Sequence, residues 1–409
     1  MMVVMSTLET PSNGATWNRA LRHRNYRLFF CGQAVSLLGS WMQMVAQSWL
    51  VYRLTGSAEM LGLVAFVSQI PVFVFGLLGG AASDHFPRRK VILVTQSAFL
   101  LQAALLASLT LSGLIAVWHV LVAAVLFGMI NAIDIPARQA FTVDLVGKED
   151  LGNAVALDAT IFNAARLVGP AMAGGVVASL GEGWCFAVNA VSFLAVLASL
   201  LLMSAVPATG AGGAGEGMLE RIRGGLAHVA GKPSILALIA LLGLSGLMGM
   251  SFSVLMPVFA SRVLGGGPEA LGLLMSAAGA GALLASVAVA VLGVGTARSR
   301  LAWGLSGFGL ALIAFALSPS LWLSAGLLAL AGMALVAHNT ASQTLVQILV
   351  ADAYRGRVMA LYSMTFMAAT PTGSLLAGFL AERMGPQPTV ALGGLACVLG
   401  GLAYRRWAP

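Results

Sequence analysis

Long apolar stretches separated by short polar segments dominate the pattern of this 409-residue chain. The hydrocarbon core of a bilayer is about 30 Å thick, so a helix needs roughly 20 apolar residues to cross it. Seven stretches without charge each supply one such helix, and they are 28–52, 60–83, 183–215, 233–261, 270–297, 358–381 and 384–404. The pattern therefore predicts an all-α membrane protein.

Three further stretches complete the expected set of helices. Residues 91–133 and 301–351 are each long enough for two helices, with breaks at 112–113 and 318–320, where Ser, Gly and Pro favour turns. Residues 151–181 supply one more helix although they include two charges. We therefore predict twelve transmembrane helices.

The basic residues predict how the helices are oriented. Lys and Arg concentrate on the cytoplasmic side of membrane helices. If the N-terminus is cytoplasmic, 18 of the 22 Lys and Arg residues fall in cytoplasmic segments, and both termini lie inside. The net charge of +8 follows from this topology and does not indicate nucleic-acid binding. With only 9% charged and 59% hydrophobic residues, an ordinary soluble domain is excluded.

An internal repeat divides the chain. Residues 139–174 align without a gap on residues 343–378, and Gln139/Gln343 and Gly169/Gly373 are among the identical pairs. Such self-similarity predicts two halves of one shape. The expected parts are a cytoplasmic segment 1–27, a six-helix half 28–206, a cytoplasmic linker 207–233 with a short amphipathic helix, and a second six-helix half 234–409.

Acidic and basic residues gather where the second apolar stretch ends, in Gly80-Ala-Ala-Ser-Asp84-His-Phe-Pro-Arg88-Arg89-Lys90. This segment resembles the signature loop of the major facilitator superfamily, G-x-x-x-D-R-x-G-R-R/K. The resemblance implies the major facilitator fold and secondary transport, with Gly80, Asp84, Arg88 and Arg89 as a gating loop. The alternative is that the bases only set topology and contact anionic lipid.

Segments 21–30 and 136–141 resemble the branch of this superfamily that is called the transmembrane secretion effectors and includes the enterobactin exporter. That resemblance implies a proton-driven exporter in the bacterial cytoplasmic membrane. Gly169, Pro170, Gly174 and Gly175 are similar to the G-P-x-x-G-G motif of drug antiporters. We interpret these four residues as a helix-bending motif, and tight helix packing is the alternative.

Ionisable residues inside a membrane helix are costly and indicate function. Asp134 and Arg166 lie on consecutive antiparallel helices, so we expect them to meet and to couple transport to protons. A static ion pair is the alternative. Uncharged polar residues of the apolar stretches are expected to line a substrate cavity or to join helices, and the candidates are Gln43, Gln47, Gln69, Asn131, Asn163 and Asn339.

No phosphate-binding G-x-x-x-x-G-K-S/T loop, zinc-ligand spacing or nucleophile motif is present, so we expect neither an enzyme nor a cofactor. We predict a monomeric secondary active transporter, embedded in lipid, that uses protons to export a small amphipathic molecule, drug-like or siderophore-like. Two alternatives remain open: an importer or lipid carrier of the same fold, and a non-transporting membrane scaffold or sensor.

Overall fold

The computed structural model describes residues 18–204, 226–227, 229, 231–292 and 297–407, and for residues 77–84, 251, 290–292, 297–299, 353 and 407 only the backbone. The described part of the chain is almost entirely helical and contains no β-strand. Its residues pack into two compact units, Met1–Gln47 with Ser68–Gly213 (unit 1) and Ser48–Val67 with Ala214–Pro409 (unit 2). Most of the predicted amphipathic helix of the linker lies outside the described residues.

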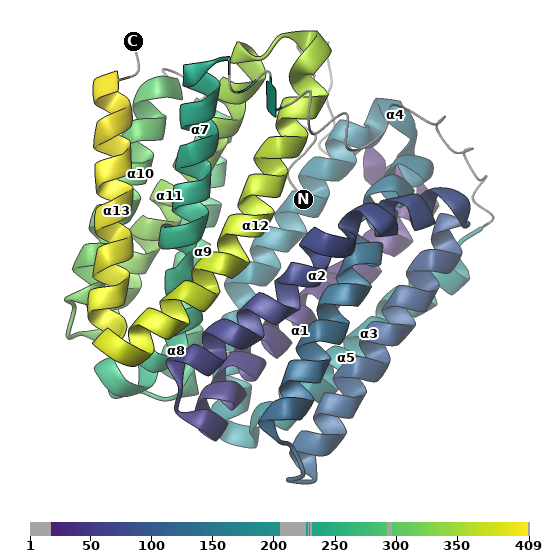
Figure 1. Ribbon diagram of the computed structural model, residues 1–409. Helices are drawn as coiled ribbons and strands as arrows, with labels where there is room; N and C mark the ends of the chain where they lie inside the picture. Colours follow the sequence, from purple (N-terminus) through teal and green to yellow (C-terminus); the bar gives the residue numbers. More distant parts are fainter. Residues whose placement is uncertain (1–17, 205–225, 228, 230, 293–296, 408–409) are drawn as a thin grey trace. The chain divides into compact units, whose positions relative to one another are not determined.

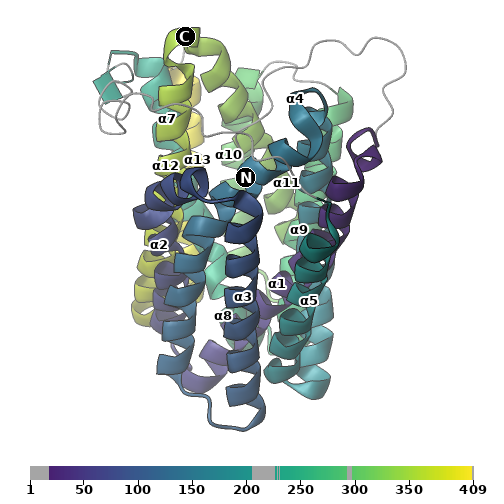
Figure 2. The ribbon, with the colours of Figure 1, turned by 90° about the vertical axis from the view of Figure 1, so that its right-hand side faces the viewer.

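The helices of the first half follow one another through short turns. They are α1 (Arg24–Thr55), α2 (Ala58–His85), α3 (Arg88–Leu111), α4 (Val117–Leu180) and α5 (Glu182–Leu202). Within unit 1, α3 packs along α5, as both views show (Figures 1 and 2). Aromatic residues fill the core between α1 and α4, where the rings of Phe29 and Phe141 meet edge to face at 5.5 Å.

Helix α4 is 64 residues long and is interrupted at one point. Gly147 has φ 73° and ψ 178°, so the helix divides there into two parts. Only glycine adopts this conformation at low cost, because it has no Cβ. A straight helix of this length would measure about 96 Å, roughly three times the thickness of a bilayer core.

The second half is less regular at its start. Pro233–Val263 is a composite of α7 (Pro233–Leu244), a π-helical segment Ser245–Gly249, a 3₁₀ segment Met250–Leu255, α8 (Met256–Val258) and a second π-helical segment Phe259–Val263. It is followed by α9 (Pro268–Leu292), α10 (Ala297–Ala316), α11 (Leu321–Leu349), α12 (Asp352–Met384) and α13 (Pro386–Trp407). Helix α10 packs between α11 and α13, and α12 turns into α13 at Gly385 (Figure 1).

The repeat seen in the sequence is also present in the helix boundaries. Helix α4 begins 204 residues before α11 (117 and 321) and ends 204 residues before α12 (180 and 384). The interruption at Gly147 in α4 therefore corresponds to the break between α11 and α12. The predicted breaks near 112–113 and 318–320 are confirmed, because α3 ends at Leu111 and α11 begins at Leu321.

In the described part of the chain, ten helices are long and apolar enough to cross a membrane, and Arg300–Ala316 is a shorter apolar helix. The predicted all-α membrane architecture is confirmed. The unit boundary does not follow the predicted halves, because Ser48–Val67, from the end of α1 and the start of α2, packs with unit 2.

Candidate functional site

A buried carboxylate, Asp134 in the first part of α4, is held by three side chains. Its Oδ1 accepts hydrogen bonds from the Thr95 hydroxyl at 2.6 Å and the Gln96 amide at 3.0 Å, both from α3. Its Oδ2 lies 2.6 Å from Nε of Arg138, which also donates to Gln33 Oε1 of α1 at 3.0 Å. The side chain of Asp134 is only 1% exposed and that of Arg138 is 30% exposed. An ion pair and two hydrogen bonds therefore stabilise a charge that burial alone would strongly disfavour.

This geometry replaces the expected partner of Asp134. We predicted a pair with Arg166, but the structure pairs Asp134 with Arg138, four residues later on the same helix. Residues at this spacing lie on one helix face, one turn apart. The i, i+4 spacing of Asp134 and Arg138 is visible in the sequence. It was not used because Arg138 was assigned to a cytoplasmic segment.

Arg166 lies in the second part of α4, half-buried, and among the described residues it makes no hydrogen bond or ion pair. The residues 2 before it and 2 after it, Ala164 and Val168, are exposed, whereas Ala165 and Gly169 are buried. Arg166 therefore projects from the side of α4 that is turned away from its exposed face.

Of the four residues of the helix-bending motif, Gly169 makes the close helix contact. A Cβ at this position would lie 2.5 Å from Cβ of Trp41 on α1, so only glycine fits. Pro170 and Gly174 are buried inside α4, whereas Gly175 is exposed, and a Cβ added to it would meet nothing within 4 Å. The backbone of α4 stays helical through the motif, and Gly147 is its single non-helical residue.

The predicted cavity residue Gln43 is instead buried in a network that joins three helices of unit 1. Its amide nitrogen donates to Gln102 Oε1 of α3 at 3.1 Å, and its Oε1 accepts from Asn189 of α5 at 2.8 Å. Gln102 also donates to the carbonyl of Ala123 in α4 at 3.2 Å. Gln43 therefore joins helices, which was the alternative interpretation of this residue.

The other predicted cavity residues are scattered. Gln69 is exposed and Gln47 is half-buried. Asn131 and Asn163 donate to carbonyls one turn earlier in α4, at 3.1 and 2.9 Å. Asn339 is buried in α11 of unit 2, and its Oδ1 has no hydrogen-bond partner among the described residues. The structure does not gather these residues into one site within either unit.

The predicted gating loop is mostly helix. Gly80 and Asp84 belong to α2, where only the backbone is described, and Arg88 and Arg89 open α3. Arg88 forms an ion pair with Asp144 of α4 at 2.6 Å, and Arg89 donates to the carbonyl of Leu201 of α5 at 3.4 Å. Both arginines anchor the start of α3 to neighbouring helices. The partner of Asp84 remains a prediction.

A contact that the sequence analysis missed fastens the start of α2 to α12 within unit 2. The Glu382 carboxylate accepts from the Ser57 hydroxyl at 3.0 Å and from the backbone N–H groups of Ala58 and Glu59 at 2.8 and 3.4 Å. Arg262 donates to the carbonyl of Gly56 at 2.6 Å. A carboxylate at a helix N-terminus satisfies free N–H groups and interacts favourably with the helix dipole.

The same helices approach closely one turn further along. A Cβ on Gly62 of α2 would lie 2.6 Å from the carbonyl oxygen of Ser374 and 3.1 Å from Cα of Gly378, both in α12. Gly378 corresponds to Gly174 in the sequence repeat. The short-range spacing of Ser57, Gly62 and Gly378 gave no sign that they meet, because the contact joins segments more than 300 residues apart.

Comparison with known proteins decides the family. Residues 15–408 match the family described as "Transmembrane secretion effector". The chain belongs to this family. It is therefore a multi-pass membrane transporter of the major facilitator type and not an enzyme, as the resemblance of its motifs implied.

Curated relatives of this transporter include pumps and siderophore carriers. The chain is 29% identical to the multidrug efflux pump Tap of Mycolicibacterium fortuitum, over 86% of this chain and 88% of that protein. It is 26% identical to the enterobactin exporter EntS of Shigella boydii, over 93% and 91%. It is 27% identical to the staphyloferrin A transporter of Staphylococcus aureus, over 64% and 66%.

Solved structures of similar fold are transporters as well. The nucleoside transporter NupG superimposes with a TM-score of 0.73 at 14% identity, over 95% of this chain and 98% of that one. A bacterial homologue of the iron transporter ferroportin gives 0.73 at 18% identity, over 94% and 98%. At these identities the likeness concerns the fold alone.

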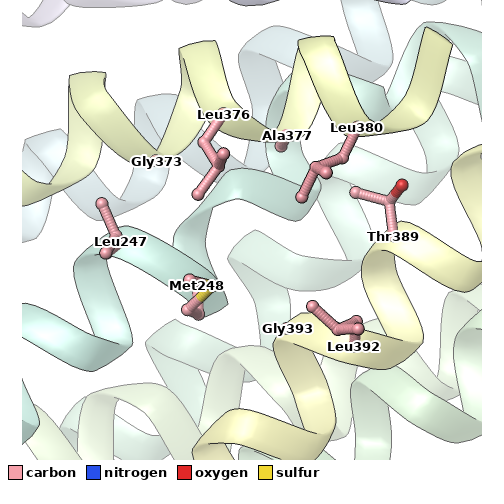
Figure 3. Close-up of a pocket in the computed structure, with 9 residues that line it drawn as sticks. All are labelled: Leu247, Met248, Gly373, Leu376, Ala377, Leu380, Thr389, Leu392 and Gly393. Atoms are coloured by element: carbon pink, nitrogen blue, oxygen red, sulfur yellow. The ribbon is translucent and has the colours of Figure 1, made fainter. Parts of the chain in front are cut away.

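A small pocket of the transporter lies in unit 2, where Gly373 of α12 and Gly393 of α13 pack on the π-helical segment at Leu247 and Met248 (Figure 3). Its cavity volume is about 10 Å³, which is about the space that one water molecule needs. Thr389 provides its one side-chain hydroxyl, and no charged residue lines it. This lining offers no charged side chain that could neutralise a charged cargo.

Proposed function

We propose that the protein is a proton-coupled exporter that moves a small amphipathic molecule, drug-like or siderophore-like, by alternating access. The names of its relatives support export, since they include an efflux pump and a siderophore exporter. The observation that carries proton coupling is the buried Asp134 carboxylate with its Arg138 partner. Coupling requires an acid whose charge is linked to the arrangement of neighbouring helices.

The Asp134 cluster meets this requirement because its members come from three helices. Thr95 and Gln96 lie on α3, Arg138 on α4 and Gln33 on α1. A proton on Asp134 would remove the negative charge and leave Arg138 without its counter-ion. Removing one partner of a buried ion pair lowers the free energy of unfolding by about 3–5 kcal/mol. We infer that this cost changes which helix arrangement is favoured. A bound proton shifts the equilibrium between two arrangements only if its affinity for them differs.

Topology and gating are part of the same proposal. Counting the two parts of α4 separately and adding α10 to the ten long helices gives twelve spans, with both termini cytoplasmic by the distribution of Lys and Arg. In this orientation, Glu382 and the α1–α2 turn lie on the outer side, and Asp84, Arg88 and Arg89 on the cytoplasmic side. Opening toward the outside would then break the contacts of Glu382 with α2.

Uptake into energised inside-out vesicles tests the proposal. A panel of siderophores, cationic dyes and lipophilic drugs is offered with and without an uncoupler. We expect accumulation that the uncoupler abolishes and that Asp134→Asn loses. Asp150→Asn is the matched control, because Asp150 lies in the same helix but pairs with His23, whose Nε2 lies 2.9 Å from Asp150 Oδ2. Accumulation that survives in Asp134→Asn with unchanged uncoupler sensitivity would remove Asp134 from coupling.

A further inference from the structure

The positive charge of Arg166 has no counter-charge in the described part of unit 1. A guanidinium stays protonated in proteins, so Arg166 cannot escape this cost by losing its proton. It lies 19 residues beyond Gly147 and 14 before Leu180 in α4, which at 1.5 Å per residue is about 28 Å and about 21 Å from the two helix ends. That depth keeps it away from lipid headgroups, which occupy the two faces of a bilayer.

The chain has few acidic residues that could neutralise Arg166. Of its 14 acidic residues, only Asp134 and Asp158 lie well inside a membrane-length stretch; the others belong to polar segments or lie near helix ends. Asp134 is engaged by Arg138, Thr95 and Gln96. Asp158 lies two turns before Arg166 and accepts from the hydroxyl of Tyr26 at 2.9 Å.

The surroundings of Arg166 suit an amphipathic ligand. One turn earlier lies Phe162, whose ring packs edge to face against Trp41 of α1 at 5.6 Å between centroids. The side-chain amide nitrogen of Asn163 donates a hydrogen bond to the carbonyl of Ala159. One turn later, Pro170 has no N–H, so the backbone carbonyl of Arg166 loses its usual i+4 donor. Phe162, Arg166 and Pro170 therefore follow one another at one-turn spacing on one face of α4.

We propose that Arg166 binds an anionic group of the transported molecule, with a carboxylate as the preferred chemistry. This inference rests on the proposed transport function and names its substrate class. The planar guanidinium donates two parallel hydrogen bonds to a carboxylate, and such a pair is stronger than bonds between neutral groups. The cargo thus supplies the counter-charge that the described part of unit 1 lacks, and Phe162 and Trp41 contact its apolar part.

Two probes of the same shape and different charge test the assignment. Purified full-length protein in detergent is titrated with 2-naphthoate and with the uncharged 2-naphthamide, and binding is measured by equilibrium dialysis. We expect the wild type to bind the carboxylate at least about tenfold more tightly than the amide, since a hydrogen bond to a charged group is worth about 1.5–3 kcal/mol and 1.4 kcal/mol is tenfold. Arg166→Gln should remove this preference, and Arg166→Lys should retain part of it.

The control is Thr370→Val in α12, because Thr370 stands 204 residues after Arg166, at the equivalent position of the repeat. It should leave the preference unchanged. Equal binding of both probes by the wild type, no binding of the carboxylate, or an unchanged preference in Arg166→Gln would overturn the assignment. If Arg166→Gln fails to fold, as judged by gel filtration and thermal melting, the wild-type probe pair and Arg166→Lys still decide it.

Vesicle transport separates this inference from the proposed function. Suppose that the wild type shows no preference for the carboxylate probe and Arg166→Gln no change, while uncoupler-sensitive accumulation persists. In that case the substrate class is wrong and the exporter proposal stands. If the carboxylate binds through Arg166 while no panel compound accumulates in an uncoupler-sensitive manner, the site is retained and proton-driven export is contradicted.

Discussion

Glycines bring helices together in both units, as at Gly169 of unit 1, but unit 1 adds a network of buried polar side chains. In unit 1, polar side chains connect neighbouring helices at buried positions, as in the network of Gln43, Gln102 and Asn189. In unit 2, glycines bring backbones together: a Cβ on Gly332 of α11 would overlap the carbonyl oxygen of Ala278 in α9. Close backbone approach at small residues and hydrogen bonds between side chains are the two ways in which membrane helices associate.

The difference extends to the equivalent positions of the repeat. In the register that relates α4 to α11 and α12, Asp134 corresponds to His338 and Arg138 to Ser342. His338 is fully buried, with Nδ1 3.0 Å from the carbonyl oxygen of Leu301 and no hydrogen-bond partner for Nε2 in the described structure. The second half therefore has no carboxylate–arginine pair at this level. We therefore expect proton chemistry in unit 1 rather than in unit 2.

The largest expected effect comes from breaking the ion pair of unit 1. Arg138→Ala leaves the buried Asp134 carboxylate uncompensated and should destabilise the protein by about 3–5 kcal/mol, whereas Asp134→Asn with Arg138→Gln should cost less than the two single changes added. Thermal melting in detergent measures this coupling. In the corresponding double-mutant cycle with Arg166 in place of Arg138, the stability losses of the two single changes should add to within about 0.5 kcal/mol. Strong coupling to Arg166 would contradict the pairing of Asp134 with Arg138.

A glycine contact of unit 2 should give the next effect. Gly332→Ala forces a methyl group against Ala278 and should cost about 1–3 kcal/mol. Gly326 lies on the same helix with nothing within 4 Å, so Gly326→Ala should be neutral or slightly stabilising. Melting temperatures of the two variants provide the measurement. Equal losses from both variants would show that close approach at Gly332 is not the cause of the loss.

The polar network of unit 1 offers the reciprocal test. Gln43→Leu removes the hydrogen-bond partner of Gln102 Oε1 and of the Asn189 amide nitrogen, and should destabilise the protein by about 1–3 kcal/mol. Gln69→Leu, at an exposed position, should leave stability unchanged. If Gln43→Leu changes cargo preference and leaves the melting temperature unaltered, Gln43 faces the cargo and its assignment to the substrate cavity is restored.

The smallest expected change concerns the start of α2. Glu382→Gln removes a negative charge from the N-terminal N–H groups of Ala58 and Glu59 and should cost about 1 kcal/mol. The control Glu59→Gln alters a carboxylate of the same turn that accepts none of these three bonds. Alkylation of a cysteine placed at Ser57 reports the opening of this contact. Labelling that stays as slow in Glu382→Gln as in the control would show that Glu382 does not hold α2.

The sequence predicted the architecture well and the partners of its residues poorly, for physical reasons. Span positions depend on local hydrophobicity, so the breaks at 112–113 and 318–320 were correctly placed. The interruption of α4 at Gly147 lies between the stretches 91–133 and 151–181, which the sequence already predicted as separate helices. The partners of Gln43 lie 59 and 146 residues away on other helices, and no periodicity reveals them. Arg138 was within reach of sequence reasoning, because its spacing from Asp134 is that of one helical turn.

The placement of residues 48–67 bears on how this chain folds during synthesis. These residues emerge early, yet their packing partners Arg262, Gly378 and Glu382 are made more than 200 residues later. When the last helix of the first repeat is inserted, residues 48–67 still lack their packing partners. The first repeat therefore cannot complete its structure at that stage. The second repeat, expressed alone, would expose Gly378 and leave Glu382 without the N–H groups that it binds. A cut at the linker would therefore separate residues 48–67 from the helices of unit 2 on which they pack.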